Sequence, residues 1–153
     1  MDRHRGGSSS RSHRPPPHGC PGRRPITYAA VLFGDTAATV ITVLNAALTP
    51  PVSGKVPNPR PPTFITVRRT GGVRLNRVAD DATVVVEAFA ATDTAALDLA
   101  QLARQALHAA RGTVVGGTVL YRIEELSGPA ELPDPISEQS RVTQTFTVAT
   151  RGS

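Results

Sequence analysis

The sequence predicts an α+β fold, with a mostly antiparallel β-sheet and two main helices packed on one face of it. Two observations lead to this prediction. Two stretches carry apolar residues at spacings of three and four, as amphipathic helices do, and short runs between and after them have the composition and alternation of strands. The expected order is helix, hairpin, strand, helix, strand, strand, and 153 residues suit one domain with one core.

The N-terminal residues 1–25 differ in composition from the rest of the chain. They contain almost no apolar side chains, so we expect a disordered Arg/Pro/Ser-rich extension ahead of a single α+β domain at residues 26–153. Six arginines stand there against Asp2 alone, whereas the remaining residues hold equal numbers of basic and acidic side chains. One interpretation makes the extension a basic arm that binds nucleic acid or a scaffold. The other, which its composition favours, makes it an unstructured segment, such as one that results from a misplaced start codon. A neutral domain argues against a general DNA-binding face.

Membrane insertion and disulfide chemistry are both disfavoured. The uninterrupted apolar run at residues 28–33 is far shorter than the about 20 residues that a membrane-spanning helix needs, so we expect a soluble protein without a membrane partner. Cys20 is the only cysteine, which excludes a disulfide within the chain and a cysteine-based metal site.

The two helices have recognisable starts and buried faces. The first is expected to begin at Asp35 or Thr36 and the second at Thr92 or Asp93, because these side chains cap helix N-termini, and Gly112 ends the second helix. One apolar face is predicted on each helix. The faces comprise Ala37, Val40, Ile41, Leu44, Ala47 and Leu48 in the first helix, and Ala96, Leu99, Ala103, Ala106, Leu107 and Ala110 in the second.

A proline-rich connection leads into a predicted hairpin. Residues 49–62 hold six prolines, which restrict the chain, with a short extended piece expected near Val52–Val56. Residues 63–69 and 73–78 have strand composition. Between them, Thr70-Gly71-Gly72 supplies the positive φ angles that a tight turn needs, so we expect the hairpin to turn there.

Three further strands are predicted. Residues 83–90 are β-branched and nearly all apolar, as in a central strand, and the preceding Asp80-Asp81 is interpreted as a loop. The other two strands alternate. Their inner faces are expected to contain Val119, Tyr121 and Ile123 in one strand, and Val142, Gln144, Phe146 and Val148 in the other.

No arrangement of catalytic or metal-binding side chains emerges, so we expect no catalytic residue, no cofactor and no metal. Three of the four histidines lie in the extension, and His108 is alone on the second helix. Glu124 and Glu125 are adjacent on a strand and point to opposite faces. Glu87, inside an apolar strand, is the most suggestive carboxylate because burial would raise its pKa. A face open to solvent, or an arginine partner across the sheet, is the favoured alternative.

Four stretches in a fixed order resemble a known family. They are PNPRPPTFITVRRTGG, ATVVVEAFAATDTAALDLAQLARQAL, GGTVLYRIEELSGPAELPDP and RVTQTFTVATRG. Their order and spacing resemble the tail terminator (tail completion) proteins of long-tailed, siphovirus-like bacteriophages of the actinobacterial-phage type, over roughly residues 31–151. Phe89 and Glu131 stand where tryptophan is more frequent in that family.

The resemblance implies a ring-forming structural protein of the virion without catalysis. Such terminators form a homohexameric ring that caps the tail tube, stops its polymerisation and provides the surface for head-tail joining. The implied partners are further copies of this chain, the major tail tube protein, the head-closure or connector protein of the neck, and DNA that passes through the channel without sequence specificity. The implied location is the tail-neck junction, after assembly in the host cytoplasm.

Arginines gather around the predicted hairpin, and three interpretations of them stay open. They pair with acidic residues of a neighbouring subunit, line the DNA path, or are solvated residues that protect a sheet edge from aggregation. Arg68 and Arg69 point to opposite faces, so at most one belongs to any single patch. We expect part of the set to form a subunit or tube interface. The candidates are Arg68, Arg69, Arg74 and Arg77 with Asp80, Asp81, Glu131 and Asp134.

Other functions remain as alternatives. A head-closure or neck connector protein is also a small ring-forming α+β protein. A nucleic-acid-binding protein of a different class would use residues 1–24 and the hairpin as its basic surface, and its binding would depend steeply on salt. A small enzyme would need a pocket around Glu87 or His108.

Overall fold

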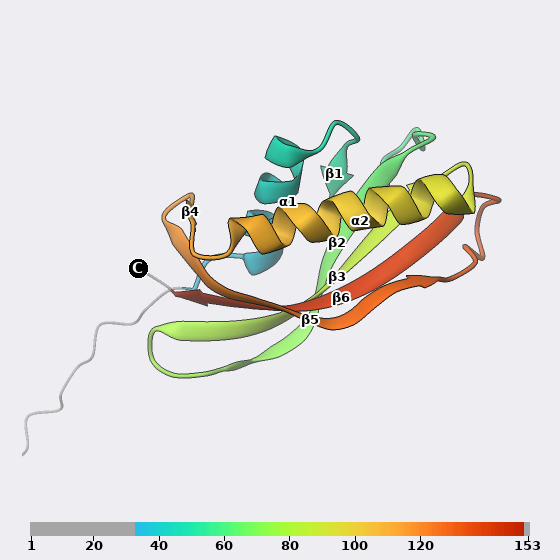
Figure 1. Ribbon diagram of the computed structural model, residues 1–153. Helices are drawn as coiled ribbons and strands as arrows, with labels where there is room; N and C mark the ends of the chain where they lie inside the picture. The colour runs from blue at the N-terminus through green and yellow to red at the C-terminus, as the bar shows by residue number, and fades with distance from the viewer. Residues whose placement is uncertain (1–32, 152–153) are drawn as a thin grey trace, which may run out of the picture.

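The computed structural model describes residues 33–151, so the expected extension at residues 1–25 lies outside the described residues. In this part of the chain, two helices cover one face of a six-stranded sheet (Figure 1). The strand order is β1-β2-β3-β6-β5-β4; only the β1–β2 pair is parallel. This confirms the predicted α+β fold. The elements are α1 (Thr36–Ala47), β1 (Val52–Ser53), β2 (Phe64–Arg74), β3 (Ala79–Ala90), α2 (Asp93–Ala110), β4 (Val114–Val115), β5 (Thr118–Glu131) and β6 (Ser140–Arg151).

Side-chain caps set the starts of both helices. Asp35 Oδ1 accepts a hydrogen bond from the Ala38 amide at 3.2 Å, and Thr92 Oγ1 accepts one from the Ala95 amide at 3.2 Å. Each cap satisfies an amide that has no partner within the first helical turn. Gly112, with φ of 81°, follows the end of α2, as predicted.

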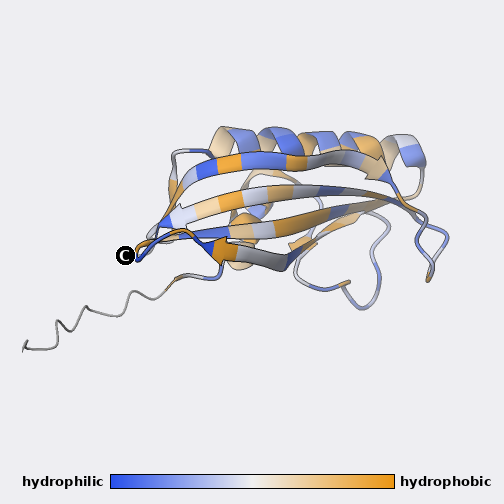
Figure 2. Ribbon diagram, turned by 90° about the horizontal axis from the view of Figure 1, so that it is seen from below, coloured by the Kyte–Doolittle hydropathy of each residue, from blue (hydrophilic) through white to orange (hydrophobic). Residues whose placement is uncertain are grey.

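The core lies between the helices and the inner face of the sheet. The predicted faces are mostly buried, although Ala47 at the end of α1 is exposed. The alanines of α2 are small enough for the helix to lie close to the strands, and Gln144 Nε2 of β6 donates to the Ala100 carbonyl at 2.9 Å. Polar and apolar residues alternate along the strands in Figure 2, as expected for a sheet with one covered face.

The predicted turn at Thr70-Gly71-Gly72 is wrong. β2 continues to Arg74, and the chain turns at residues 75–78, where Asn76 Oδ1 accepts hydrogen bonds from the Val78 and Ala79 amides at 2.9 Å. The register between β2 and β3 shifts between Arg69 and Gly71, which marks a β-bulge. The glycines therefore serve the bulge and a close strand approach, while the asparagine side chain supports the turn.

Two other details of the strands differ from the prediction. Asp80-Asp81 belongs to β3 and not to a loop, because β3 begins at Ala79. In β5 the register shifts between Leu120 and Arg122, so Leu120 and Ile123 are buried whereas Tyr121 is exposed. The shift places the extra residue outside the core and interrupts the alternation that the sequence suggested.

Candidate assembly surfaces

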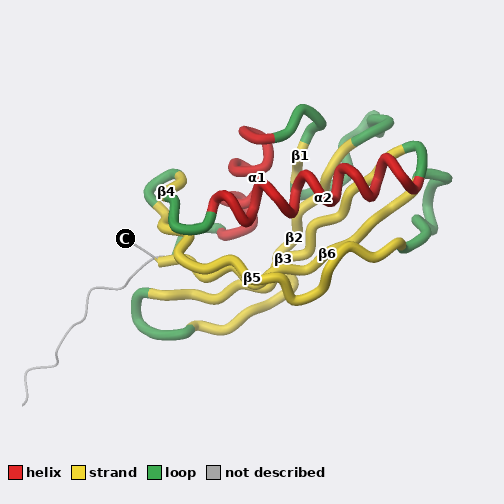
Figure 3. Tube along the Cα trace, viewed as in Figure 1, coloured by secondary structure: helices red, strands yellow, loops and turns green. Residues whose placement is uncertain are grey.

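The end of the β2–β3 hairpin projects from the sheet and is exposed. We call residues 68–81 the hairpin arm; its tip is the loop between β2 and β3 at the lower left of Figure 3. All side chains at residues 68–78 are exposed. Val73 keeps 65% of its surface exposed, and Leu75 and Val78 are exposed as well. The arm thus presents apolar side chains among arginines.

Arg68 and Arg69 lie on opposite faces of the arm, as the alternation predicted. Arg68 Nη2 is 3.4 Å from Glu87 Oε2 on the face away from the helices, and Arg69 Nη1 is 2.9 Å from Asp80 Oδ2 on the helix side. Arg68 keeps 58% of its side-chain surface exposed despite its partner. An ion pair as exposed as Arg68–Glu87 contributes little to stability, so the Arg68 guanidinium remains available for a further contact.

Arg74 and Arg77 lie at the turn of the arm. The Arg74 guanidinium donates to the carbonyls of Asn76 at 3.0 Å and Arg77 at 3.1 Å, and it lies 4.9 Å from the centre of the Phe33 ring. Arg77 is exposed within the turn. Arg74 therefore orders the turn while the tip as a whole stays positively charged.

The two aspartates at the base of the arm have partners in their own chain. Asp80 is buried beside Arg69, and Asp81 Oδ2 accepts a hydrogen bond from Arg122 Nη2 of β5 at 2.8 Å. They lie on opposite faces of β3, so each carboxylate holds the arm on a different side. Both help to fix the direction in which the arm leaves the sheet.

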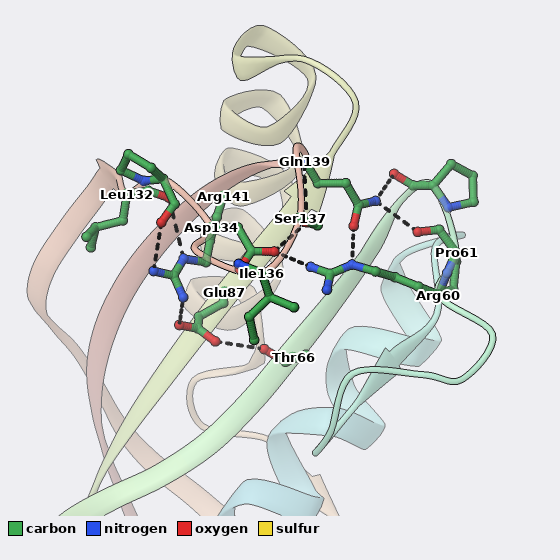
Figure 4. Close-up of polar contacts among 12 residues, drawn as sticks. Arg60, Pro61, Thr66, Glu87, Leu132, Asp134, Ile136, Ser137, Gln139 and Arg141 are labelled. Atoms are coloured by element: carbon green, nitrogen blue, oxygen red, sulfur yellow. Dashed lines mark hydrogen bonds and ion pairs between the residues drawn. The ribbon is translucent and has the colours of Figure 1, made fainter.

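A polar network ties together two loops at the opposite end of the sheet (Figure 4). We call it the loop clasp: Arg60 of the proline-rich connection bonds to Asp134 and to Gln139 Oε1, and Gln139 Nε2 donates to the Pro61 and Pro62 carbonyls at 2.9 and 3.0 Å. The Arg60 guanidinium also lies 5.4 and 5.3 Å from the stacked rings of Phe64 and Phe89. The sequence prediction gave Arg60 and Gln139 no role.

Asp134 supplies the carboxylate of the clasp, and only 4% of its side chain is exposed. Its loss of solvent would raise its pKa, but hydrogen bonds from Ser137 Oγ and the Ile136 amide, with the charge and hydrogen bond of Arg60, outweigh this and lower the pKa below its ordinary value. The folded loop therefore favours the ionised carboxylate.

Glu87 has arginine partners across the sheet, which confirms the favoured alternative. Thr66 Oγ1 donates to Glu87 Oε2 at 3.1 Å, Arg68 lies near the same oxygen, and Arg141 Nη1 is 3.6 Å from Oε1. A cavity of about 320 Å³ adjoins these side chains. His108 keeps 45% of its side chain exposed and its Nε2 lies 3.7 Å from Glu125 Oε2. Each of the two groups thus has structural partners.

A larger groove of about 500 Å³ lies at the same end as the clasp. We call it the acidic groove. Its lining includes Asp93, Glu131, Leu132, Pro133, Asp134 and Glu138. Arg141 is the one arginine of the lining, and its guanidinium donates to the Leu132 and Pro133 carbonyls at 3.4 and 3.2 Å. Three of its carboxylates, those of Asp93, Glu131 and Glu138, are exposed and form no ion pair within residues 33–151. The structure therefore brings Glu131 and Asp134 together but separates both from the arm.

The described residues contain neither a metal-binding cluster nor a helix that could span a membrane. Within residues 33–151, no three His, Cys, Asp or Glu side chains are grouped so that they could hold a metal ion. Neither helix of this range is long and apolar enough to cross a membrane.

Comparisons with known proteins identify the family. No curated protein matches the chain. Among solved structures, a chain of the "Virion of native gene transfer agent (GTA) particle" is similar, with 16% identity, coverage of 76% of this chain and 87% of that chain, and a TM-score of 0.48. Residues 34–153 match the family model described as "Phage tail termination protein", which confirms the resemblance seen in the sequence. The protein thus belongs to the phage tail termination protein family and is a structural tail terminator of the virion.

Proposed function

We propose that the protein forms a homohexameric ring on the last ring of the tail tube, stops tube polymerisation there and presents the surface to which the DNA-filled head joins. Membership of the tail termination family is the observation that carries this proposal. The exposed mixture of apolar and arginine side chains on the hairpin arm supports it, because such mixtures are typical of protein interfaces. In this proposal the ring lies at the tail-neck junction and assembles in the host cytoplasm.

The interface uses part of the candidate set. A neighbouring subunit or the tail tube is contacted by the arginines of the arm, which are Arg68, Arg69, Arg74 and Arg77. Glu131, at the opposite end of the sheet, contacts a neighbouring subunit. Asp80, Asp81 and Asp134 act indirectly, because their intrachain partners hold the arm and the clasp in shape.

The partners are further copies of this chain, the major tail tube protein and the head-closure or connector protein of the neck. DNA passes through the ring without sequence-specific contacts. The protein acts without catalysis, a proposal supported by the structural partners of Glu87 and His108. Residues 26–153 act as one domain, and the extension expected at residues 1–25 lies outside the described residues.

Electron microscopy of particles assembled without this gene tests the proposal. We expect overlong, headless tails beside DNA-filled, tailless heads, because tube growth has lost its stop. Tails of normal length beside heads that leak DNA would move the protein to head closure in the neck. Unchanged particles would refute an assembly function, and steep salt-dependent DNA binding lost on deletion of residues 1–24 would then favour the nucleic-acid alternative.

A further inference from the structure

The arm exposes more apolar surface than a solvated strand end needs. Val73, Leu75 and Val78 are exposed together at its tip, and Arg74 and Arg77 stand beside them. Exposed apolar side chains that are grouped and bordered by charged ones mark protein contact sites more often than scattered ones do. The tip would therefore suit a partner with both apolar and acidic groups.

The acidic groove offers both kinds of group. Leu132 and Pro133 contribute apolar lining, and Asp93, Glu131 and Glu138 contribute carboxylates without ion-pair partners within residues 33–151. The loop clasp holds one wall of the groove, since Asp134 and Gln139 belong to both. A wall that is already ordered loses little entropy when a partner docks.

The arm and the groove lie at opposite ends of the sheet. The strand β3 begins in the arm at Ala79 and ends at Ala90, just before the groove residue Asp93. Its 12 residues span about 35 Å at the rise of an extended strand. Figure 1 shows the β2–β3 loop at the left of the sheet and the β5–β6 loop at the right. One copy therefore cannot fill its own groove with its own arm.

We propose that the hairpin arm of one copy docks in the acidic groove of the next copy. The contact joins two different patches, so it is heterologous, and repetition with a rotation closes it into a ring. Arg74 and Arg77 then face the carboxylates of Glu131 and Glu138, while the apolar tip contacts Leu132 and Pro133. This inference rests on the proposed ring and names the surfaces that form it.

Complementary charge reversals in the full chain test the docking. One variant carries Arg74→Glu and Arg77→Glu on the arm; the other carries Glu131→Arg and Glu138→Arg in the groove. Sedimentation of the wild type at rising concentration is expected to show association beyond a dimer that weakens with salt. Each variant alone is expected to associate at least about tenfold more weakly, because like charges meet.

The equimolar mixture of the two variants is the decisive sample. In an alternating ring, each reversed arm meets a reversed groove and each normal arm meets a normal groove, so association is expected to return to about the wild-type level. Asp98→Arg on α2 and Arg111→Glu directly after the end of α2 are exposed positions outside both surfaces; these matched charge controls should leave association unchanged. Thermal melting of every variant checks that the fold is retained, and Val73→Glu supplies a second arm variant if the double reversal fails to fold.

Several results would overturn the inference. The first is a mixture of the two variants that associates no more strongly than either variant alone. The second is that each variant alone associates as strongly as the wild type. The third is that both the wild type and the mixture remain monomeric. The outcome is separable from that of the gene deletion. If the gene deletion gives overlong tails but mixing the two variants does not restore association, only the arm-groove contact is refuted. If mixing restores association but the gene deletion leaves the particles unchanged, the ring at the end of the tail is refuted and the contact stands.

Discussion

Gly72→Ala is expected to destabilise the hairpin arm strongly. Gly72 has φ of 128°, a conformation that side chains with a Cβ rarely adopt. A Cβ atom placed there would lie 2.2 Å from the Asp81 carbonyl oxygen and 2.7 Å from the Ala82 Cα. Both contacts are with the backbone of β3, so no side-chain rotation relieves them, and the two strands must separate.

The expected cost is about 3 kcal/mol in free energy of unfolding, from a strained backbone of about 1–3 kcal/mol together with weakened hydrogen bonds between β2 and β3. This is a large share of the about 5–15 kcal/mol that stabilises a typical domain. Urea denaturation followed by far-ultraviolet circular dichroism measures the change. Hydrogen exchange of the arm amides shows whether the arm opens before the rest of the domain.

Gly71→Ala is the matched control, one residue away. Its added Cβ meets nothing within 4 Å and its φ lies outside the positive region. It is expected to change the free energy of unfolding by less than about 1 kcal/mol. Equal stability losses in the two variants would refute the assignment of the close strand approach to Gly72.

Two further predictions concern the core and the clasp. Gln144→Leu is expected to change the free energy of unfolding, measured by urea denaturation, by less than about 1 kcal/mol. The substitution removes one buried hydrogen bond, but it also removes the buried Oε1 atom, which has no hydrogen-bond partner among the described residues, so the two effects offset each other. A loss above about 3 kcal/mol would contradict this reasoning. Asp134→Asn is expected to destabilise the clasp at neutral pH. Because the folded chain lowers the pKa of Asp134, the carboxylate's contribution is complete above the pKa of the unfolded chain, near pH 4, and disappears as pH falls through the lower folded value. The stability gap between wild type and variant, measured by urea denaturation across pH, should therefore shrink toward acid pH, and a gap that widens there would contradict the assignment.

The helices, most of the strand β3 and the buried face of β6 were predictable because their signals are local. The cap at Asp35 involves an amide three positions away, and the alternation around Phe146 repeats every two residues. The bulges at Thr70 and Tyr121 were missed because they depend on how neighbouring strands pair. A glycine pair has the same local appearance in a turn and in a bulge.

The candidate surfaces were predictable only in part. The arginines of the arm stood out because they cluster in sequence. The clasp did not, since Arg60 and Asp134 lie 74 positions apart and meet only when two loops fold over one end of the sheet. For the same reason the sequence did not show that Asp81 takes Arg122, 41 positions away, as its partner.

Polymerisation of purified major tail tube protein in the presence of this protein tests the central claim most directly. Tube lengths are measured by electron microscopy as the full-length chain is added in rising amounts. A tail terminator is expected to shorten the tubes progressively and to appear as a ring at one end of each. Tubes of unchanged length without end density, at any ratio of the two proteins, would contradict the claim that this chain stops tail growth.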